Sequence, residues 1–185
     1  HEYSSLTELA LKQQSDTVVP IRDFRPEVPP QLDNPVLLPD PVSPHIAAER
    51  AGATVQLAPI LQAYQQLAAQ ADAVVVEGAG GWQVPLSPYL RIADLAVALQ
   101  LPVVLVVGLR LGCINHALLT ADAIRASGLP LAGWIASRVD PQMREPEANL
   151  AYLRQHLGAP LLADLPWQAQ PDARAVPVQL PLAWQ

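Results

Sequence analysis

The feature that most constrains the fold is an alternation of short apolar runs with helical patterns along the second half of the chain. Three apolar runs have the length and composition of buried strands: 102–107, 131–136 and 160–165. Segments with apolar residues at helical spacing flank them: 92–100, 113–127 and 145–157. Alternating strands and helices imply crossover connections between parallel strands. The sequence therefore predicts an α/β fold, a parallel sheet with crossover helices.

The first half of the chain is less regular. A fourth apolar run at 73–77 predicts another strand, and the pattern before it predicts a helix over 57–71. Ser43 followed by Pro44 is a preferred helix start and Gly52 a preferred stop, so we expect a short helix over 44–51.

Prolines dominate the segment before that helix. Seven of the chain's twenty prolines fall between Pro26 and Pro44. Neither a helix nor a central strand suits such a segment, and we expect an extended surface connection over 20–44. A short amphipathic helix is expected over 4–14, and an irregular tail over 168–185.

Length and composition favour one domain over 1–185, because 185 residues with 51% hydrophobic content suffice for one sizeable core. The longest apolar run, 101–109, is about half of the roughly twenty residues that a spanning helix needs, so we expect no membrane association. A net charge of −6 argues against nucleic acid and favours a small-molecule partner. A single cysteine, Cys113, and no signal peptide pattern favour the cytoplasm.

The run 73–77 ends in an acid, Glu77, which three glycines follow within four positions. Ligands of open parallel sheets bind beyond the carboxyl ends of the strands, where Glu77 would lie. A single carboxylate suffices for Mg²⁺, which completes its shell with water and phosphate oxygens. The alternative is a solvated acid before a tight turn.

Three further loops follow predicted strands and should lie on the same edge of the sheet. Gly112 precedes a predicted helix whose free N–H groups favour an anion, with the Asn115 amide nearby; the alternative is an ordinary turn that Asn115 caps. Ser137 and Arg138 follow one strand, and Pro166 and Trp167 follow the next. These groups could frame a nucleobase, although a tryptophan is more often buried in a core or interface.

Together these segments resemble the dethiobiotin synthase family. The match is carried by "PVSPHIAAE" at 41–49, "VVVEGAGGWQVPL" at 74–86, "LPVVLVVGLRLGCINHALLTADAIRASGLPLAGWIAS" at 101–137, and "APLLADLPW" at 159–167. Residues 1–40 match poorly. The resemblance implies a three-layer, Rossmann-like fold of the P-loop NTPase class, and ATP-dependent closure of the ureido ring of dethiobiotin from 7,8-diaminononanoate and CO₂, through a phosphorylated carbamate.

The resemblance also implies roles for residues. Glu77 would be a Mg²⁺ ligand, and Gly78, Ala79 and Gly80 would line the nucleotide site, with Gly80 also near the substrate. Substrate contacts across a homodimer interface would come from Leu111, Gly112 and Asn115. The adenine of ATP would lie near Ser137, Arg138, Pro166, Trp167 and Gln168, although the family commonly has Asn at the position of Ser137.

One family element does not occur in these 185 residues. The family begins with a strand, a loop of the type G-x-x-x-x-G-K-[ST] and a second strand that ends in a catalytic lysine, whereas the one lysine here, Lys12, matches neither family lysine. We therefore assign no catalytic residue and expect this chain alone to be inactive. The alternatives are a non-catalytic, dimeric binding or regulatory module of the same descent, and another ATP-dependent ligase with a similar sheet.

Overall fold

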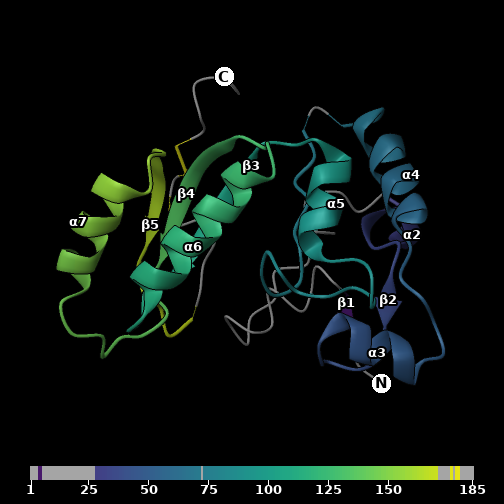
Figure 1. Cartoon of the computed structure of the whole chain (residues 1–185), viewed down its shortest axis with the longest axis horizontal. Coiled ribbons are helices and arrows are strands. Elements are labelled where there is room, and N and C mark those ends of the chain that lie inside the picture. Colours follow the sequence, from purple (N-terminus) through teal and green to yellow (C-terminus); the bar gives the residue numbers. More distant parts are fainter. Residues whose placement is uncertain (1–3, 6–27, 72, 171–175, 177, 180–185) are drawn as a thin grey trace. The chain divides into compact units, whose positions relative to one another are not determined.

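The computed structural model describes residues 4–5, 28–71, 73–170, 176 and 178–179 (Figure 1). The chain divides into two compact units, His1–Leu99 and Gln100–Gln185, and each has its own apolar core. The expectation of one domain over 1–185 stays a prediction.

The unit Gln100–Gln185 contains a parallel sheet in the order β3-β4-β5. Its strands are β3 (Val103–Gly108), β4 (Leu131–Ser137) and β5 (Leu161–Leu165). Helices α6 (Cys113–Ala126) and α7 (Pro146–His156) form the two crossovers, and α6 packs on β3, β4 and α7 (Figure 1). The predicted α/β architecture, with its parallel strands and crossover helices, is confirmed.

The core of this unit lies between the sheet and the two helices. Trp134 of β4 is fully buried there, with Leu153 and Leu157 from the region of α7. Gly128 and Gly158 lie just beyond α6 and α7 and have φ angles of +84° and +61°, a conformation that L side chains rarely adopt. These glycines end both helices and turn the chain toward the next strand.

In the described part of the unit His1–Leu99, helices account for most of the regular secondary structure. Its elements are β1 (Ser4–Ser5), α2 (Pro30–Asp33), β2 (Leu37–Leu38), α3 (Pro44–Arg50), α4 (Leu57–Ala68) and α5 (Ile92–Leu99). The core is formed by Leu38, Ala47, Ala48, Val55, Ile60, Leu86 and Leu95. The helix predicted over 44–51 is confirmed, although the Ser43 hydroxyl contacts His45 Nδ1 at 2.9 Å and does not cap the helix.

The strand predicted over 73–77 is wrong. Residues 73–77 have no regular secondary structure, and the Val75 side chain is 91% exposed. A strand requires a neighbour that satisfies its backbone N–H and C=O groups, and no described strand pairs with this segment. Apolar composition alone therefore did not make it a strand.

The proline-rich connection is also more structured than expected. It contains the one-turn helix α2, which begins at Pro30, where a helix has no need of the missing N–H. It also contains β2, which pairs with β1 in a small antiparallel sheet.

The helix predicted over 4–14 lies outside the described residues except for Ser4–Ser5, which form β1. In the predicted irregular tail, the Gln179 backbone N–H donates a hydrogen bond to the Leu162 carbonyl of β5 at 2.8 Å.

Within the described part of the chain, no helix is both long and apolar enough to cross a membrane.

Candidate functional site

The loop that contains Glu77 belongs to the first unit. The Glu77 side chain is half-buried, and this burial raises the pKa of its carboxyl above the ordinary value. Among the described residues, no group of three or more His, Cys, Asp or Glu side chains gathers as a metal site. A divalent cation at Glu77 would therefore need ligand or water oxygens to complete its shell.

The glycines after Glu77 bring the backbone close to two apolar side chains. A Cβ on Gly80 would lie 2.7 Å from Val84 Cγ2, and φ at Gly80 is +83°. A Cβ on Gly78 would lie 3.0 Å from Ile92 Cγ2. The contact at Gly80 is shorter than carbon atoms tolerate and its φ angle is one that favours glycine, whereas a side chain at Gly78 would require Ile92 to move by a few tenths of an ångström.

The first residues of α5 form hydrogen bonds with the part of this loop that follows the glycines. The Ile92 backbone N–H donates to the Val84 carbonyl at 2.9 Å, and the Ala93 N–H donates to the Trp82 carbonyl at 3.0 Å. An isolated antiparallel bridge joins Pro85 to Arg91. Backbone hydrogen bonds thus join residues 82–85 to the start of the helix.

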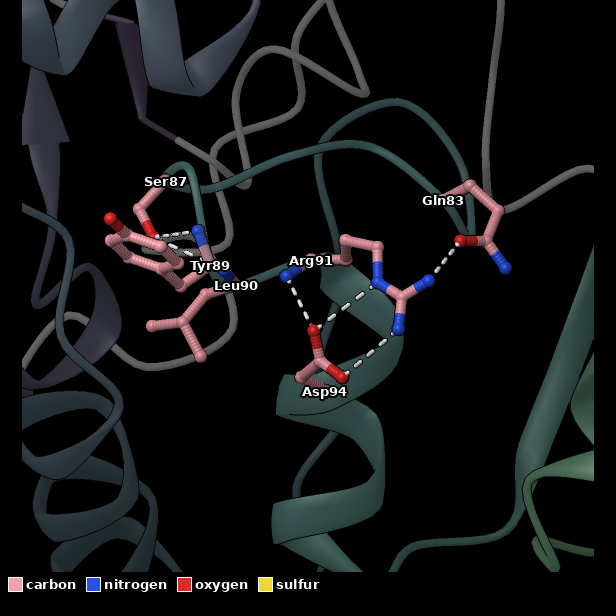
Figure 2. A network of polar contacts seen from close by, with 6 residues as sticks. All are labelled: Gln83, Ser87, Tyr89, Leu90, Arg91 and Asp94. Atoms are coloured by element: carbon pink, nitrogen blue, oxygen red, sulfur yellow. Dashed lines mark hydrogen bonds and ion pairs between the residues drawn. The ribbon is translucent and has the colours of Figure 1, made fainter.

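Arg91 and Asp94 reinforce this connection (Figure 2). Asp94 Oδ2 accepts a hydrogen bond of 2.7 Å from the Arg91 backbone N–H, the reciprocal contact of a helix capping box. Arg91 Nη1 also donates to Gln83 Oε1 at 2.9 Å. The backbone and side-chain hydrogen bonds from Arg91 lower the pKa of Asp94, so the pair stays charged at neutral pH.

A second turn lies beside this pair in Figure 2, where Ser87 Oγ accepts hydrogen bonds from the backbone N–H groups of Tyr89 and Leu90 at 3.2 and 3.1 Å. Sequence analysis identified neither this turn nor the Arg91–Asp94 pair. The signal for the pair was an acid three residues after Arg91, at the start of the predicted helix 92–100.

In the second unit, the predicted loops leave from the same edge of the sheet. Gly108 of β3 pairs with Ser137 of β4, and Ser137 pairs with Leu165 of β5. The loops that begin at Leu109, Arg138 and Pro166 therefore start side by side at the carboxyl ends of the strands. The expectation that these loops share one edge is confirmed for this unit. Glu77 belongs to the unit His1–Leu99.

The loop between β3 and α6 presents the predicted helix start. Gly112 is the residue before α6, with φ at +94°, and no atom lies within 4 Å of the place where a Cβ would stand. Leu111 is 94% exposed, and Asn115 is exposed in the first turn of the helix. Cys113 is buried in the core of the unit, in line with a packing role.

The loops after β4 and β5 carry the other predicted residues. The Arg138 backbone N–H donates to the Leu165 carbonyl at 2.9 Å, which joins the two strand ends. Pro166 and Trp167 are exposed, and the Trp167 side chain is about half accessible. The indole is therefore open to a ligand and is not part of the core.

The Arg138 side chain is held by two carboxylates. Its Nε and Nη2 donate to the two oxygens of Asp164 at 2.9 and 2.8 Å, and Nη1 donates to Glu147 Oε1 at 2.7 Å. Hydrogen bonds with Asp164 and then Glu147 raise the pKa of the guanidinium above its usual value. The sequence analysis missed both acids, although an aspartate inside the apolar run 160–165 indicates a charged partner.

Comparisons with known proteins identify the family of this chain. A family model described as an AAA domain matches residues 8–175. The fold, with three loops on one edge of a parallel sheet, and this match define the chain as an α/β protein of the AAA domain family.

Curated relatives define the family more closely. An ATP-dependent dethiobiotin synthetase BioD of Xanthomonas oryzae pv. oryzae (strain PXO99A) is 57% identical over 150 residues, which cover 80% of this chain and 67% of the relative. Proteins of the same name are 59% identical over 140 residues in Ralstonia nicotianae, covering 76% and 61%, and 53% identical over 155 residues in Aromatoleum aromaticum, covering 83% and 69%. The chain spans about two thirds of the length of these relatives. It belongs to the ATP-dependent dethiobiotin synthetase family.

Proposed function

We propose that this protein catalyses the ATP-dependent closure of the ureido ring of dethiobiotin from 7,8-diaminononanoate and CO₂, a step of biotin synthesis. The observation that carries the proposal is the identity of 53–59% with curated ATP-dependent dethiobiotin synthetases. The sheet edge with three loops, in the class of fold that binds ligands at this edge, supports it.

The reaction joins two amines through one carbon. One amine of the substrate adds to CO₂ and gives a carbamate, whose oxygen then takes the γ-phosphoryl group of ATP. The second amine attacks the carbamoyl carbon, a C–N bond forms, and phosphate leaves with the former carbamate oxygen. Catalysis of this kind depends on positioning and on neutralising phosphate charge.

Glu77 is the residue that we propose as the Mg²⁺ ligand. Its carboxylate is an oxygen donor of the kind that Mg²⁺ prefers, and its partial burial shields the charge from water. A bound Mg²⁺ supplies charge neutralisation at the phosphate oxygens of ATP. The backbone of Gly78, Ala79 and Gly80, which packs tightly on Val84 and Ile92, would line the nucleotide beside it.

We propose that the adenine lies over the loops after β4 and β5. The Ser137 hydroxyl and the exposed indole of Trp167 are a hydrogen-bonding group and a flat apolar surface, which together suit a nucleobase. Pro166 and Gln168 flank the indole. Arg138 lies at the same strand ends, although carboxylates already hold its side chain.

The diamine substrate would bind at the start of α6, with the Gly112 and Asn115 region facing its carboxylate. Free N–H groups of the first helical turn and the helix dipole favour an anion there. The 94% exposure of Leu111 leaves that side chain open to a partner surface, which supports a homodimer with a shared site.

We place the enzyme in the cytoplasm, with no nucleic acid or membrane partner.

The test uses the protein expressed from its complete reading frame, with dethiobiotin measured by mass spectrometry. We expect product only when ATP, Mg²⁺, diaminononanoate and CO₂ are all present. Glu77→Gln keeps the shape of the side chain but removes its charge. Loss of an outer-shell partner of a metal ligand already costs about 10–100-fold, so we expect loss of this direct ligand to cost at least about 10²-fold in rate or in Mg²⁺ affinity. Glu49→Gln, an exposed change of the same kind on α3, is the matched control.

Three results would each contradict a different part of the proposal. Product formation without ATP would exclude the mechanism, and equal rates for Glu77→Gln and Glu49→Gln would exclude the metal role of Glu77. Diaminononanoate binding with no product under any condition would instead support a non-catalytic binding module.

A further inference from the structure

The side chains that hold Arg138 form a cluster that the proposed function does not use. Arg138, Asp164 and Glu147 come from the end of β4, from β5 and from the first turn of α7, and we refer to them as the Arg138 clamp. The side chains of Arg138 and Asp164 are only 24% and 28% exposed, whereas that of Glu147 is 73% exposed. The partly buried, bidentate Arg138–Asp164 pair is thus the centre of the clamp.

The strand register explains why the pair forms. Asp164 pairs with Ala136, and Arg138 lies two residues after Ala136 on the same strand path. Side chains two residues apart point to the same face of a sheet, so both charged groups lie on one face as diagonal neighbours. The Arg138 backbone N–H donates to the Leu165 carbonyl at 2.9 Å. Arg138 therefore holds the two residues that directly precede Pro166, Asp164 through its side chain and Leu165 through its backbone.

The charge of the clamp argues against a direct contact with the phosphates of a nucleotide. All three guanidinium nitrogens of Arg138 already donate to carboxylate oxygens. One cation faces two carboxylates, so the cluster carries a net negative charge, which repels phosphate. Such a corner of the sheet suits the uncharged base of a nucleotide better than its phosphates.

We propose that Arg138 is a positioning residue that acts through Asp164, and that it holds the Pro166–Gln168 loop so that Trp167 presents its indole to the nucleobase. This inference rests on the proposed function, because it assumes that ATP binds at this edge of the sheet. Asp164 and Glu147 become part of the nucleotide site without touching the nucleotide. Trp167 is the group that makes the contact.

The chemistry of arginine makes the proposal specific. A guanidinium matches the two oxygens of a carboxylate, whereas a lysine ammonium is a point charge that cannot span both. Lysine would replace an arginine that only supplies positive charge to a ligand. It would not replace an arginine whose purpose is to align Asp164.

The experiment measures ATP affinity by equilibrium titration and KM for ATP by turnover, with the protein from its complete reading frame. The variants are Arg138→Gln, Arg138→Lys, Asp164→Asn and the double variant Arg138→Gln/Asp164→Asn. Arg154→Gln, an exposed Arg-to-Gln change on α7, is the matched control. Urea unfolding of each variant shows whether the native fold is retained.

We expect each single variant to weaken ATP binding about tenfold and to change kcat less than about twofold, and the double variant to be no weaker than either single one. Lysine at position 138 should not restore affinity, and Arg154→Gln should match the wild type. If Arg138→Gln does not fold, Arg138→Lys and the nearly isosteric Asp164→Asn decide the matter.

The opposite pattern would overturn the proposal. If Arg138 contacts ATP directly, Asp164→Asn frees its charge and leaves affinity unchanged or improves it, lysine rescues binding, and two independent losses multiply to about a hundredfold. A wild-type protein that binds ATP but forms no dethiobiotin would refute the proposed function and leave this test intact. A wild-type protein that binds no ATP would refute both.

Discussion

The parallel sheet has a tight contact at Gly133 that provides a quantitative test of its packing. Gly133 lies in the central strand β4, and a Cβ built there would stand 2.6 Å from Leu162 Cγ and 2.7 and 2.8 Å from its two methyl carbons. Leu162 is only 5% exposed, and the atoms that clash include its branch point. The side chain has little freedom to move away, so Gly133→Ala overpacks the contact between β4 and β5.

The size of the effect follows from two opposing terms. Overpacking a well-packed interior destabilises by about 1–3 kcal/mol, whereas replacing glycine with alanine inside a strand recovers about 0.5–1 kcal/mol of backbone entropy. We therefore expect Gly133→Ala to lower the free energy of unfolding by about 1–2 kcal/mol. Gly108→Ala is the control in β3, because its Cβ would lie 3.3 Å from Val139 Cγ2 and requires only a small adjustment. That change should be within about 0.5 kcal/mol of neutral.

Urea unfolding followed by tryptophan fluorescence measures these effects, since Trp134 is fully buried next to Gly133. Leu162→Ala alone should cost about 2–5 kcal/mol. In the double variant, the new methyl group at position 133 enters the space that Leu162 vacates. The double variant should then be at least about 1 kcal/mol more stable than the sum of the single effects predicts. A neutral Gly133→Ala, or additive effects in the double variant, would refute this account of the packing.

Two predictions concern the first unit. Gly80→Ala should lower the free energy of unfolding of this unit by about 1–3 kcal/mol, because φ is +83° and Val84 Cγ2 lies 2.7 Å from the new Cβ. Urea unfolding measures the effect, with Gly81→Ala as the control because its Cβ would meet no atom within 4 Å. Equal stabilities of the two variants would contradict this prediction. Asp94→Asn should cost about 0.5–1 kcal/mol at pH 7, because it weakens the capping box with Arg91. The native pKa of Asp94 is lowered, so its contribution is present above the unfolded-state pKa of about 4 and is lost as pH falls through the native pKa. The free energy of unfolding should therefore differ less between Asp94→Asn and the wild type at pH 3 than at pH 7. An equal difference at both pH values would argue against the charged pair.

The second unit could be predicted closely from the sequence because its signals are local. The apolar runs, the helical spacing between them and the glycines at 128 and 158 set β3, β4, β5 and the two crossover helices to within about two residues. Parallel pairing then followed from topology, and with it the common edge from which the three loops begin.

Two of the failures concern contacts between segments distant in sequence, and one concerns a short helix that begins at a proline. The run 73–77 has strand composition, but a strand also depends on a neighbour, which composition does not reveal. Residues 30–33 form a turn of helix because Pro30 occupies the one position where proline helps. The pairing of Arg138 with Asp164 depends on strand register, which no local pattern specifies.

An experiment with labelled CO₂ shows whether this protein uses ATP to close a ureido ring. The protein from its complete reading frame is incubated with ATP, Mg²⁺, diaminononanoate and ¹³C-labelled bicarbonate as the source of CO₂. We expect labelled dethiobiotin with the ¹³C in the ureido carbonyl, and an equal amount of ADP. ATP hydrolysis without labelled product, or labelled product without ADP, would refute ATP-dependent ring closure by this protein.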